Sequence, residues 1–571
     1  MFAKKPLTLT AIVLSVALTA SCTRLPTNTE PQALRPFDPQ STAAEVVAPI
    51  PGREADLLLR DFYAAGAVPA GDYEAARSYL TPAARDVWNP SESVLIVDRI
   101  DLNTQPGGNN QRRSLSVRGN VIGALEEGGA FVPEAGVYEA TVELEQVGGE
   151  WRISSLPSGI IMERNELRNQ YQPFNIYFAG KSSNVIVGDR RWVYSGRDSL
   201  DTVIMSLITA GPSERLAPAV ENILPPDAAF TGKSDGIYEF SNMASMDTEK
   251  RTQFAGQVVW TLAMAGVSGP YKLNVDGAPI LGDKEELTTD DFASMNPQTA
   301  SNDVAKLYAL TNGDVHEVSG GEVTRLEGEL GSEGNVSSVE ISSDGGVAAV
   351  LKNPDNEEEQ IFAVGNLSGK KDEVLRARTI SRPSFEQNSN VAWVVVDGTK
   401  VVRAVQSTDS GDIVSSEVGT PFLEDIGGEI SMLRLSRTGS RAAMIIDGRL
   451  FIGIVERTRA GERSIVNVME YATELSGAAV SVDWNPDGSL VVGTSSPDSP
   501  VKRVELDGSS VTAYPSGNIN GPVVAVSAGP TMIYATDANA LLQLPTTGTE
   551  YTNWREVPGL QGVRSAPVVA K

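Results

Sequence analysis

The pattern of hydrophobic and polar positions changes character several times along the chain. An apolar segment at residues 7–20 follows Lys4 and Lys5. It has the length of a signal-peptide core and is too short to span a bilayer as a helix. Residues 23–50 are rich in Pro, Thr, Ala and Gln and lack hydrophobic periodicity, which predicts a flexible tether.

A helical pattern followed by an alternating one comes next. Residues 53–92 carry apolar side chains at roughly helical intervals, at Leu57, Phe62, Tyr73, Ala76, Tyr79 and Leu80. Pro69 and Pro82 divide this stretch into short helices. Alternating segments then predict strands, the last of them a hairpin with two glycines at its turn and Trp151 just after it. This order resembles the NTF2-like fold, a cone-shaped α+β fold that can hold a pocket.

A second mixed pattern begins near residue 170. Residues 173–180 predict a strand, and a helix then ends at Gly211, with Ser199 or Asp198 as its N-cap. A second helix at 251–266 has apolar side chains near one face, at Phe254, Val258, Leu262 and Ala265. The segments LITAGP, ILPPDAAF, AGQVVWTLAMAG and YKLNVDG, in this order, resemble the GerMN domain.

From residue 303 onward one unit recurs: a strand, a tight polar turn and an apolar strand. The equivalent turn positions are spaced 44, 50, 49 and 42 residues apart, at Gly345, Ser389, Gly439, Gly488 and Pro530. A strand-only repeat of this period predicts β-propeller blades, with a pair of β-sandwiches as the alternative. Residues 563–571 would supply an inner strand to the incomplete blade at 305–316 and so close the ring. Five full repeats and this composite blade give six blades, with seven as the alternative count.

Cys22 is the only cysteine in 571 residues and follows the small residues Ala20 and Ser21. This arrangement resembles the lipobox of bacterial lipoproteins, which implies that the thiol takes a diacylglycerol and that the peptide is cut just before it. Thr19 stands where that pattern prefers Leu, so a simply secreted protein is the alternative. Two or three acyl chains would anchor the protein stably, whereas one chain is marginal. Cys22 is therefore the predicted lipidation site.

The chain is thus expected to be multidomain, with two α+β domains (NTF2-like and GerMN) followed by an all-β propeller. The expected divisions are a signal peptide at 1–21, a lipidated flexible tether at 22–50, an NTF2-like domain at 51–168, a GerMN domain at 169–282, a linker at 283–302 and the propeller at 303–571.

Composition and motifs exclude several classes of chemistry. The formal net charge of −26 disfavours binding to nucleic acid, and a single cysteine excludes an intrachain disulfide and CxxC-type zinc sites. His316 is the only histidine, and we expect it to be structural or solvated. The G-x-S-x-G match at 232–236 is followed by a strand where a nucleophile elbow needs a helix, which favours a polar turn.

Two acidic segments are also better explained as a turn and a solvated loop than as functional sites. Asp483, Asn485 and Asp487 have the spacing of an EF-hand loop, but Thr494 stands where a bidentate Glu is required. We therefore expect an inter-strand turn there and a solvated loop at the DNEEE run of 355–359. No nucleophile, base and oxyanion site assembles, so no catalytic, metal-binding or cofactor-binding residue is predicted and the protein is not expected to be an enzyme.

The order of parts resembles the LpqB lipoproteins of actinobacteria over nearly the whole chain. The resemblance implies a lipoprotein anchored to the cell membrane through lipids such as palmitate, on its extracytoplasmic side. It further implies binding to the extracytoplasmic domain of the sensor histidine kinase of an MtrA–MtrB two-component system, with effects on cell-wall homeostasis and cell division. The alternative is a receptor that binds cell-wall glycan or peptide, with peptidoglycan as its partner; a wall-polymer hydrolase is a weaker third hypothesis.

Overall fold

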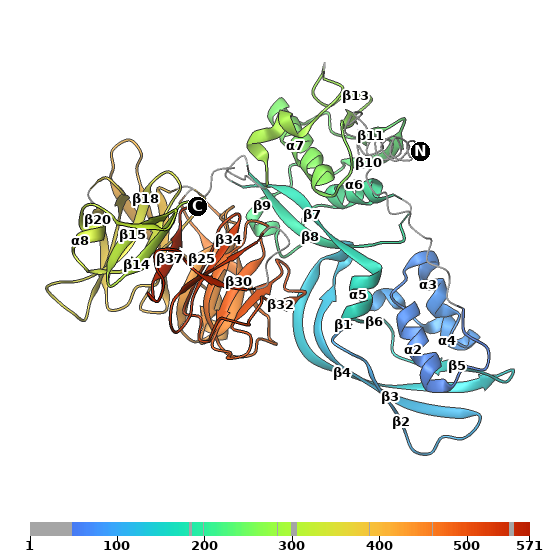
Figure 1. Cartoon of the computed structure of the whole chain (residues 1–571). Coiled ribbons are helices and arrows are strands. Elements are labelled where there is room, and N and C mark those ends of the chain that lie inside the picture. Colours follow the sequence, from blue (N-terminus) through green and yellow to red (C-terminus); the bar gives the residue numbers. More distant parts are fainter. Residues whose placement is uncertain are drawn as a thin grey trace, which may run out of the picture. The chain divides into compact units, whose positions relative to one another are not determined.

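The computed structural model describes most of the chain beyond the N-terminal segment. The described residues are 48–181, 185–197, 199–282, 284–297, 305–369, 371–387, 389–459, 461–546 and 553–571. All of them belong to one unit, Glu45–Lys571. We call its three parts the N-terminal region (48–170), the middle region (171–297) and the propeller (305–571), shown in Figure 1.

Three short helices open the N-terminal region: α2 (Ala55–Ala65), α3 (Ala70–Arg77) and α4 (Pro82–Val87). They are divided at the prolines, as predicted, because proline lacks an N–H and is tolerated only near a helix start. Pro69 is the N-cap of α3, and Pro82 is the first residue of α4. The Thr81 hydroxyl accepts the Ala84 N–H at 3.2 Å and so caps α4.

The buried face of α2 differs from the predicted one by one position. Leu57, expected on the apolar face, is 39% exposed, whereas Leu58 and Leu59 are buried. The buried stripe continues through Phe62 and Tyr63, which lie three to five residues further along the same face. Leu57 therefore points away from the core, although its sequence spacing to Phe62 looked helical.

A curved sheet follows, with the strand order β5-β4-β3-β1-β6 and β2 paired to β3. The elements are η1 (Pro90–Glu92), β1 (Val94–Val97), β2 (Asp101–Thr104), β3 (Arg112–Leu125), η2 (Glu127–Gly129), β4 (Phe131–Val147), β5 (Glu150–Ser155), β6 (Ile160–Glu163) and α5 (Arg164–Gln170). The predicted hairpin is present, because Gly148 and Gly149 adopt positive φ between β4 and β5. Trp151 is buried beneath the helices. The expected α+β layout is confirmed.

The middle region combines two small sheets with two helices. Its elements are β7 (Tyr171–Gly180), β8 (Ile186–Tyr194), α6 (Leu200–Ala210), η3 (Ala217–Ala219), β9 (Val220–Glu221), β10 (Ala229–Ser234), β11 (Ile237–Ser241), α7 (Thr248–Met264), β12 (Lys272–Val275), β13 (Ala278–Pro279) and η4 (Thr289–Met295). Of the two expected N-caps of α6, Ser199 accepts the Thr202 N–H at 3.4 Å, and Asp198 lies outside the described residues. β8 was not predicted, because its three consecutive charged residues interrupt the apolar alternation.

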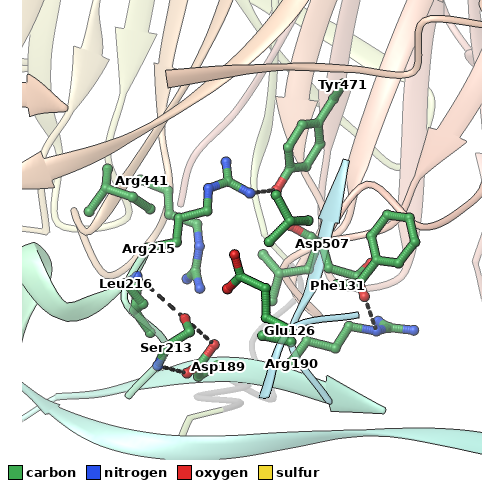
Figure 2. A pocket seen from close by; sticks show the side chains of 14 residues that line it. Glu126, Phe131, Asp189, Arg190, Ser213, Arg215, Leu216, Arg441, Tyr471 and Asp507 are labelled. Atoms are coloured by element: carbon green, nitrogen blue, oxygen red, sulfur yellow. Dashed lines mark hydrogen bonds and ion pairs between the residues drawn. The ribbon is translucent and has the colours of Figure 1, made fainter. Parts of the chain in front are cut away.

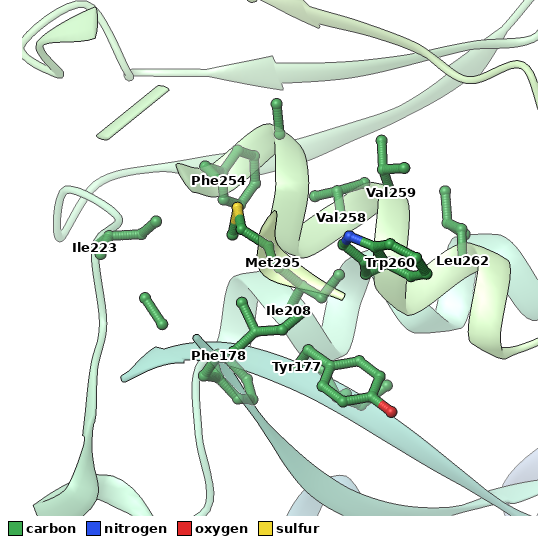
Figure 3. Packing of buried hydrophobic residues seen from close by; sticks show 14 of the residues in the cluster. Tyr177, Phe178, Ile208, Ile223, Phe254, Val258, Val259, Trp260, Leu262 and Met295 are labelled. Carbon is green, nitrogen blue, oxygen red and sulfur yellow. The ribbon is translucent and has the colours of Figure 1, made fainter. Parts of the chain in front are cut away.

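The core of the middle region forms around α7 (Figure 3). Phe254, Val258 and Leu262 are fully buried there, as predicted from their helical spacing. The segment expected to be a linker contributes to this core, since Phe292 and Met295 of η4 are buried and the Trp260 indole N–H donates to the Phe292 carbonyl at 2.8 Å. The acidic composition of that stretch hid these two apolar contacts.

A glycine permits the close approach of η4 to α7. A Cβ at Gly256 would lie 2.5 Å from the Met295 sulfur, closer than real Cβ atoms come, and 3.0 Å from the Phe292 ring. Any larger residue at this position would therefore force Met295 to shift within the core.

The described residues of the propeller form six four-stranded sheets, and each sheet is one blade. Blade 1 contains β16 (Glu322–Arg325), β15 (Asp314–Ser319), β14 (Leu307–Thr311) and β37 (Ala566–Val569). Blade 2 contains β17 (Val336–Ile341), β18 (Gly346–Lys352), β19 (Gln360–Asn366) and β20 (Lys371–Ala377). Blade 3 contains β21 (Ser384–Phe385), β22 (Val391–Val396), β23 (Lys400–Gln406) and β24 (Ile413–Glu417). Blade 4 contains β25 (Ile430–Leu435), β26 (Arg441–Ile446), β27 (Arg449–Glu456) and β28 (Ser464–Tyr471).

Blade 5 contains β29 (Ala479–Trp484), β30 (Leu490–Thr494), β31 (Val501–Val504) and β32 (Val511–Ala513). Blade 6 contains β33 (Ala525–Ala528), β34 (Met532–Thr536), β35 (Leu541–Pro545) and β36 (Arg555–Glu556). The short helices α8 (Glu329–Ser332) and α9 (Phe422–Ile426) lie between blades 1 and 2 and between blades 3 and 4 along the chain. Each of the five predicted turn positions lies between the first and second strands of a blade. Six blades are confirmed, and the β-sandwich alternative is wrong.

Blade 1 is the composite blade that the sequence predicts. β37, at the C-terminal end of the chain, pairs antiparallel with β14, with Tyr308 opposite Val568 and Leu307 opposite Val569 (Figure 1). Val568 is 2% exposed and packs in one cluster with residues of blades 1 and 2. The two ends of the repeat array thus close the ring, and the inner edge of β14 is not left unpaired.

A buried ion network joins the innermost strands at the centre of the ring. The Arg434 guanidinium on β25 donates to Glu340 on β17 at 2.7 and 3.0 Å and approaches Asp483 on β29 at 3.3 Å. All three residues are at most 4% exposed. Asp483 also pairs with the Lys571 ammonium at 2.5 Å and accepts the Ala528 N–H, while Arg382 donates to Glu340 and to the Pro567 carbonyl.

This network fixes the ionisation of its acidic members. Burial alone would raise the pKa of Asp483, but Lys571 and Arg434 outweigh burial and hold that pKa well below its usual range. Because the residues come from or flank the innermost strand of each blade, the network ties all six described blades to one another. It also fills the described centre of the ring with side chains.

We predict that Val568→Asp destabilises the protein by about 3–5 kcal/mol, because it buries an unpaired charge at the point of ring closure. Val414→Asp is the matched control: Val414 is 67% exposed on β24, and its replacement should change stability by less than about 0.5 kcal/mol. Urea unfolding followed by tryptophan fluorescence measures both. Equal effects of the two substitutions would contradict the role of β37.

We predict that Asp483→Asn lowers the free energy of unfolding by about 3 kcal/mol at pH 7, because it leaves buried cations less compensated. Since the folded-state pKa of Asp483 is depressed, its contribution is present above the unfolded value of about 3.9 and is lost as pH falls towards the folded value. The difference between wild type and variant should therefore shrink below about pH 4. Thermal unfolding between pH 7 and pH 3 measures this, with exposed Asp498→Asn as the control; a difference that stays constant with pH would contradict the assignment.

Candidate functional site

The predicted lipidation site, Cys22, lies outside the described residues, as do the signal peptide and most of the tether. Among the described residues no helix is long and apolar enough to cross a membrane. The lipidation of Cys22 therefore stays a prediction from the sequence.

The G-x-S-x-G match at 232–236 is a turn, as expected. Ser234 is the last residue of β10, and Asp235 and Gly236 have positive φ in the hairpin that leads into β11. No helix follows Ser234, so its hydroxyl is not presented as a nucleophile elbow would present it.

The EF-hand-like spacing at 483–487 also resolves into an inter-strand turn. Asp483 belongs to the ion network at the ring centre, Asn485 donates to the Ser489 hydroxyl at 3.0 Å, and Asp487 accepts from the Ser489 hydroxyl at 2.7 Å. Across the described residues, no group of three or more His, Cys, Asp or Glu side chains could hold a metal ion. The acidic loop 355–359 connects β18 and β19 and is largely exposed.

His316 lies on β15 of blade 1, and its Nδ1 is buried without a hydrogen-bond partner. Its acidic neighbours are engaged elsewhere: Asp314 pairs with Arg325, and Glu317 lies 3.7 Å from the Lys306 ammonium. No serine or cysteine side chain is recorded as hydrogen bonded to His316 within the described part of the chain. The expectation that His316 is structural or solvated stays a prediction.

A polar site that no sequence motif predicted lies at the junction of the three regions (Figure 2). Its residues come from all three regions: Glu126 and Phe131 from the N-terminal region, Asp189, Arg190, Ser213, Arg215 and Leu216 from the middle region, and Arg441, Ile454, Tyr471 and Asp507 from the propeller. These positions are separated by up to 381 residues, so neither periodicity nor spacing could bring them together.

β8 of the middle region supplies the first set of contacts. The Trp192 indole N–H donates to Asp507 at 2.9 Å, and both residues are buried. The neighbouring Arg190 pairs with Glu505 at 2.9 Å and lies 3.5 Å from Asp507. These contacts join β8 to the turn between β31 and β32 of blade 5. Arg190, one of the three charged residues that interrupt the apolar alternation of β8, thus contributes to this interface.

Arg215 supplies the second set of contacts. Its guanidinium donates to the Tyr471 hydroxyl and to the Ile452 carbonyl, and its Cζ lies 5.0 Å from the centroid of the Tyr471 ring. Asn467 donates back to the Arg215 carbonyl at 2.9 Å. Ile454 completes the contact on the apolar side, because it packs in the buried cluster of the middle region.

The N-terminal region is held to the same place. Asp189 accepts from the Arg191 guanidinium at 2.8 Å and from the Ser213 N–H at 2.7 Å, and Arg191 also donates to the Gly128 carbonyl. Gly508 of blade 5 has a φ of +79°, and a Cβ there would lie 2.7 Å from the Pro133 ring. This contact therefore requires glycine both for its backbone conformation and for the close approach.

The junction encloses a cavity of about 40 Å³. That volume suffices for a few water molecules but not for a drug-sized ligand. Arg441 extends into the interface and donates to the Gly188 carbonyl at 2.7 Å, and burial lowers the pKa of its guanidinium. With guanidinium donors, carboxylates and a phenol but no activated nucleophile, the junction is suited to holding three domains in one orientation.

Larger clefts lie elsewhere. One of about 380 Å³ is lined in the middle region by residues from Ala263 to Tyr271 and by Thr288 and Thr289. Another of about 380 Å³ lies between blades 5 and 6 and is lined by four prolines with Tyr514 and Arg503. Neither cleft contains the predicted candidates His316 or Ser234.

Comparison with known families accounts for the order of the three regions. A model described as "Lipoprotein LpqB, N-terminal domain" matches residues 48–168, and one described as "Sporulation and spore germination" (the GerMN domain) matches 175–281. A model described as "Lipoprotein LpqB beta-propeller domain" matches residues 313–570. Among solved structures, the β-propeller domain of Cps50 (Swd1) covers 45% of this chain and 87% of its own, with 13% identity and a TM-score of 0.30.

Whole-chain relatives share this organisation. A Lipoprotein LpqB of Corynebacterium diphtheriae is 41% identical over 565 residues, which cover 97% of each chain. One of Rhodococcus jostii is 37% identical, covering 98% of this chain and 97% of its own, and one of Mycolicibacterium smegmatis is 33% identical, covering 98% and 99%. The chain therefore belongs to the LpqB lipoprotein family, with an N-terminal α+β domain, a GerMN domain and a C-terminal β-propeller.

Proposed function

We propose that this lipoprotein is anchored through acylated Cys22 on the extracytoplasmic side of the cell membrane and binds a sensor histidine kinase of the MtrA–MtrB type. Through that contact it modulates signalling that affects cell-wall homeostasis and cell division. The observation that carries the proposal is the three-domain junction. Contacts such as Trp192–Asp507 and Arg215–Tyr471 join the N-terminal region, the middle region and the propeller, so a partner would meet them as one body.

A binding role fits the chemistry of the described residues better than catalysis does. Ser234 ends a strand at a hairpin turn, no group of three or more His, Cys, Asp or Glu in the described residues could hold a metal ion, and the family is named for a lipoprotein. A protein without catalytic groups can modulate a kinase only if it binds the two signalling states with different affinities. A rigid three-domain body suits this requirement, because a change in the kinase surface then cannot be absorbed by loose domains.

A cell-wall receptor is the second candidate, and the cleft of about 380 Å³ in the middle region favours it. The central funnel of the propeller is disfavoured as a glycan-binding site, because the side chains of the Arg434 network occupy the described centre of the ring. A pull-down of the protein on purified peptidoglycan separates this candidate from the first.

We predict that Cys22→Ser releases the protein from the membrane fraction, because the variant has no thiol to carry the diacylglycerol. Fractionation of cells that express the full chain, with detection by antibody, measures this. Ser21→Ala keeps the thiol and a small residue before it, and should leave the protein with the membrane. Retention of Cys22→Ser in the membrane fraction would contradict the lipid anchor.

We predict that crosslinking in intact cells couples the full chain to the extracytoplasmic domain of a sensor kinase. The full chain in detergent should then bind variants of that kinase locked on and locked off with affinities that differ at least fivefold, the low end of typical coupling. Equal affinities would exclude modulation by binding, even if the crosslink is found. Capture on peptidoglycan without any kinase crosslink would instead favour the receptor hypothesis.

A further inference from the structure

A second buried ion cluster, independent of the ring centre, lies between blades 3 and 4. Glu386, in the turn after β21, accepts from Arg403 at 3.0 Å and from Arg457 at 2.9 Å, and Arg463 lies 3.4 Å away. The side chains of these three arginines are 10–13% exposed, and that of Glu386 is 6% exposed. Three guanidinium groups therefore surround one carboxylate.

This cluster has a net positive charge although the propeller around it is rich in acidic residues. The propeller residues 305–571 contain 22 Lys and Arg against 35 Asp and Glu, so an excess of cations runs against the local composition. Burial lowers the pKa of Arg457; Glu386 opposes that shift, and Arg463 and Arg403 add to it. In the described part of the chain, Glu386 is the one carboxylate within ion-pair distance of the three arginines. Two of the three guanidinium charges therefore have no counterion.

The Glu386 carboxylate is saturated and each nitrogen of Arg463 donates, to Glu386 or to the Glu462 carbonyl, whereas Arg403 and Arg457 keep unused nitrogens. Glu386 Oε2 accepts from Arg403 and from the Trp393 indole N–H, and Oε1 accepts from Arg457 and Arg463. Only the Nε of Arg403 and one terminal nitrogen of Arg457 are used in these contacts. Within the described part of the chain, the other guanidinium nitrogens of Arg403 and Arg457 have no hydrogen-bond partner and are not fully buried, so they keep N–H groups that can donate.

The neighbouring turn of blade 4 packs closely against the pair of Glu386 and Arg457. Gly439 has a φ of +63°, and a Cβ there would lie 3.1 Å from Glu386 Cγ and 3.3 Å from the nearest Arg457 nitrogen. A glycine at this position therefore leaves space for the pair between Glu386 and the Arg457 nitrogen that donates to it. The arrangement is a cluster of guanidinium groups held in place by one buried carboxylate.

We propose that Arg403, Arg457 and Arg463 form a binding site for a dianionic phosphoryl group, as free phosphate or as a phosphomonoester on a larger molecule. Planar guanidinium groups match the oxygens of phosphate through paired N–H donors. Two uncompensated positive charges match the double negative charge of that group. Glu386 acts as the internal support that orients the three arginines and keeps their forks apart.

The test is calorimetric titration of the full chain in detergent with inorganic phosphate and with glycerol phosphate, at constant ionic strength set with chloride. We expect both to bind, and the double variant Arg457→Gln/Arg463→Gln to bind each at least about tenfold more weakly. Arg449→Gln is the matched control, because Arg449 is half-exposed on blade 4 in an ordinary pair with Glu470. Its affinity should stay within about twofold of wild type. Binding of inorganic phosphate alone identifies a free-phosphate site, and tighter binding of glycerol phosphate identifies a site for phosphomonoesters.

A second variant, with the opposite expected effect on phosphate affinity, tests the site even if the double variant loses stability. Glu386→Gln raises the uncompensated charge from two to three and frees donors, so it should bind phosphate more tightly than wild type. A merely structural cluster would show no phosphate binding in either protein. Acetate that binds as well as phosphate, or phosphate binding that the double variant keeps while its tryptophan fluorescence remains native, would overturn the assignment.

Discussion

The guanidinium of Arg434 is the constraint on which the propeller depends. A buried charge is unstable unless it is paired and hydrogen bonded, and the partners of Arg434 come from blades 2 and 5 while its own strand belongs to blade 4. The hydrophobic clusters of the propeller, by contrast, each join only neighbouring blades. Among the described residues, packing thus holds adjacent blades together, and the ion network relates blades across the ring. Lys571 brings the C-terminus into the same network, so ring closure and charge compensation depend on each other.

The same physical logic extends to the junction between the regions. Its contacts are mainly polar and charged, which is typical of surfaces between domains and unlike the apolar interior of each domain. Arg190, Arg215 and Arg441 all lie there, in a chain whose net charge is −26. Paired guanidinium groups give geometric specificity that apolar contacts lack, because they accept only oxygens placed in particular directions. The orientation of the three domains is therefore specified by a few directional contacts.

Local features of the fold could be predicted from the sequence, and contacts across long separations could not. The turns at Gly345, Gly439 and Gly488 can be recognised from the sequence, because a tight turn between strands favours residues that adopt positive φ. The composite blade was predictable because an unpaired strand at each end is costly. Arg434 and Glu340, however, are 94 residues apart, and nothing in either neighbourhood marks the other as its partner. β8 is the clearest example of a strand that could not be predicted. Its charged residues, which include Arg190 of the interface, interrupt the apolar alternation by which a strand is recognised.

The candidate sites follow the same division. Motif reasoning correctly assigned 232–236 and 485–488 to turns, because each motif needs a structural context that the local sequence denies it. It could not find the sites built from arginine, because arginine has no fixed spacing when its partners come from different blades. In an acidic protein, an arginine that is buried and only partly compensated is informative, since burial is costly and carboxylates are abundant enough to neutralise it. Such arginines lie between blades 3 and 4 and at the domain junction, where partners from distant parts of the sequence meet them.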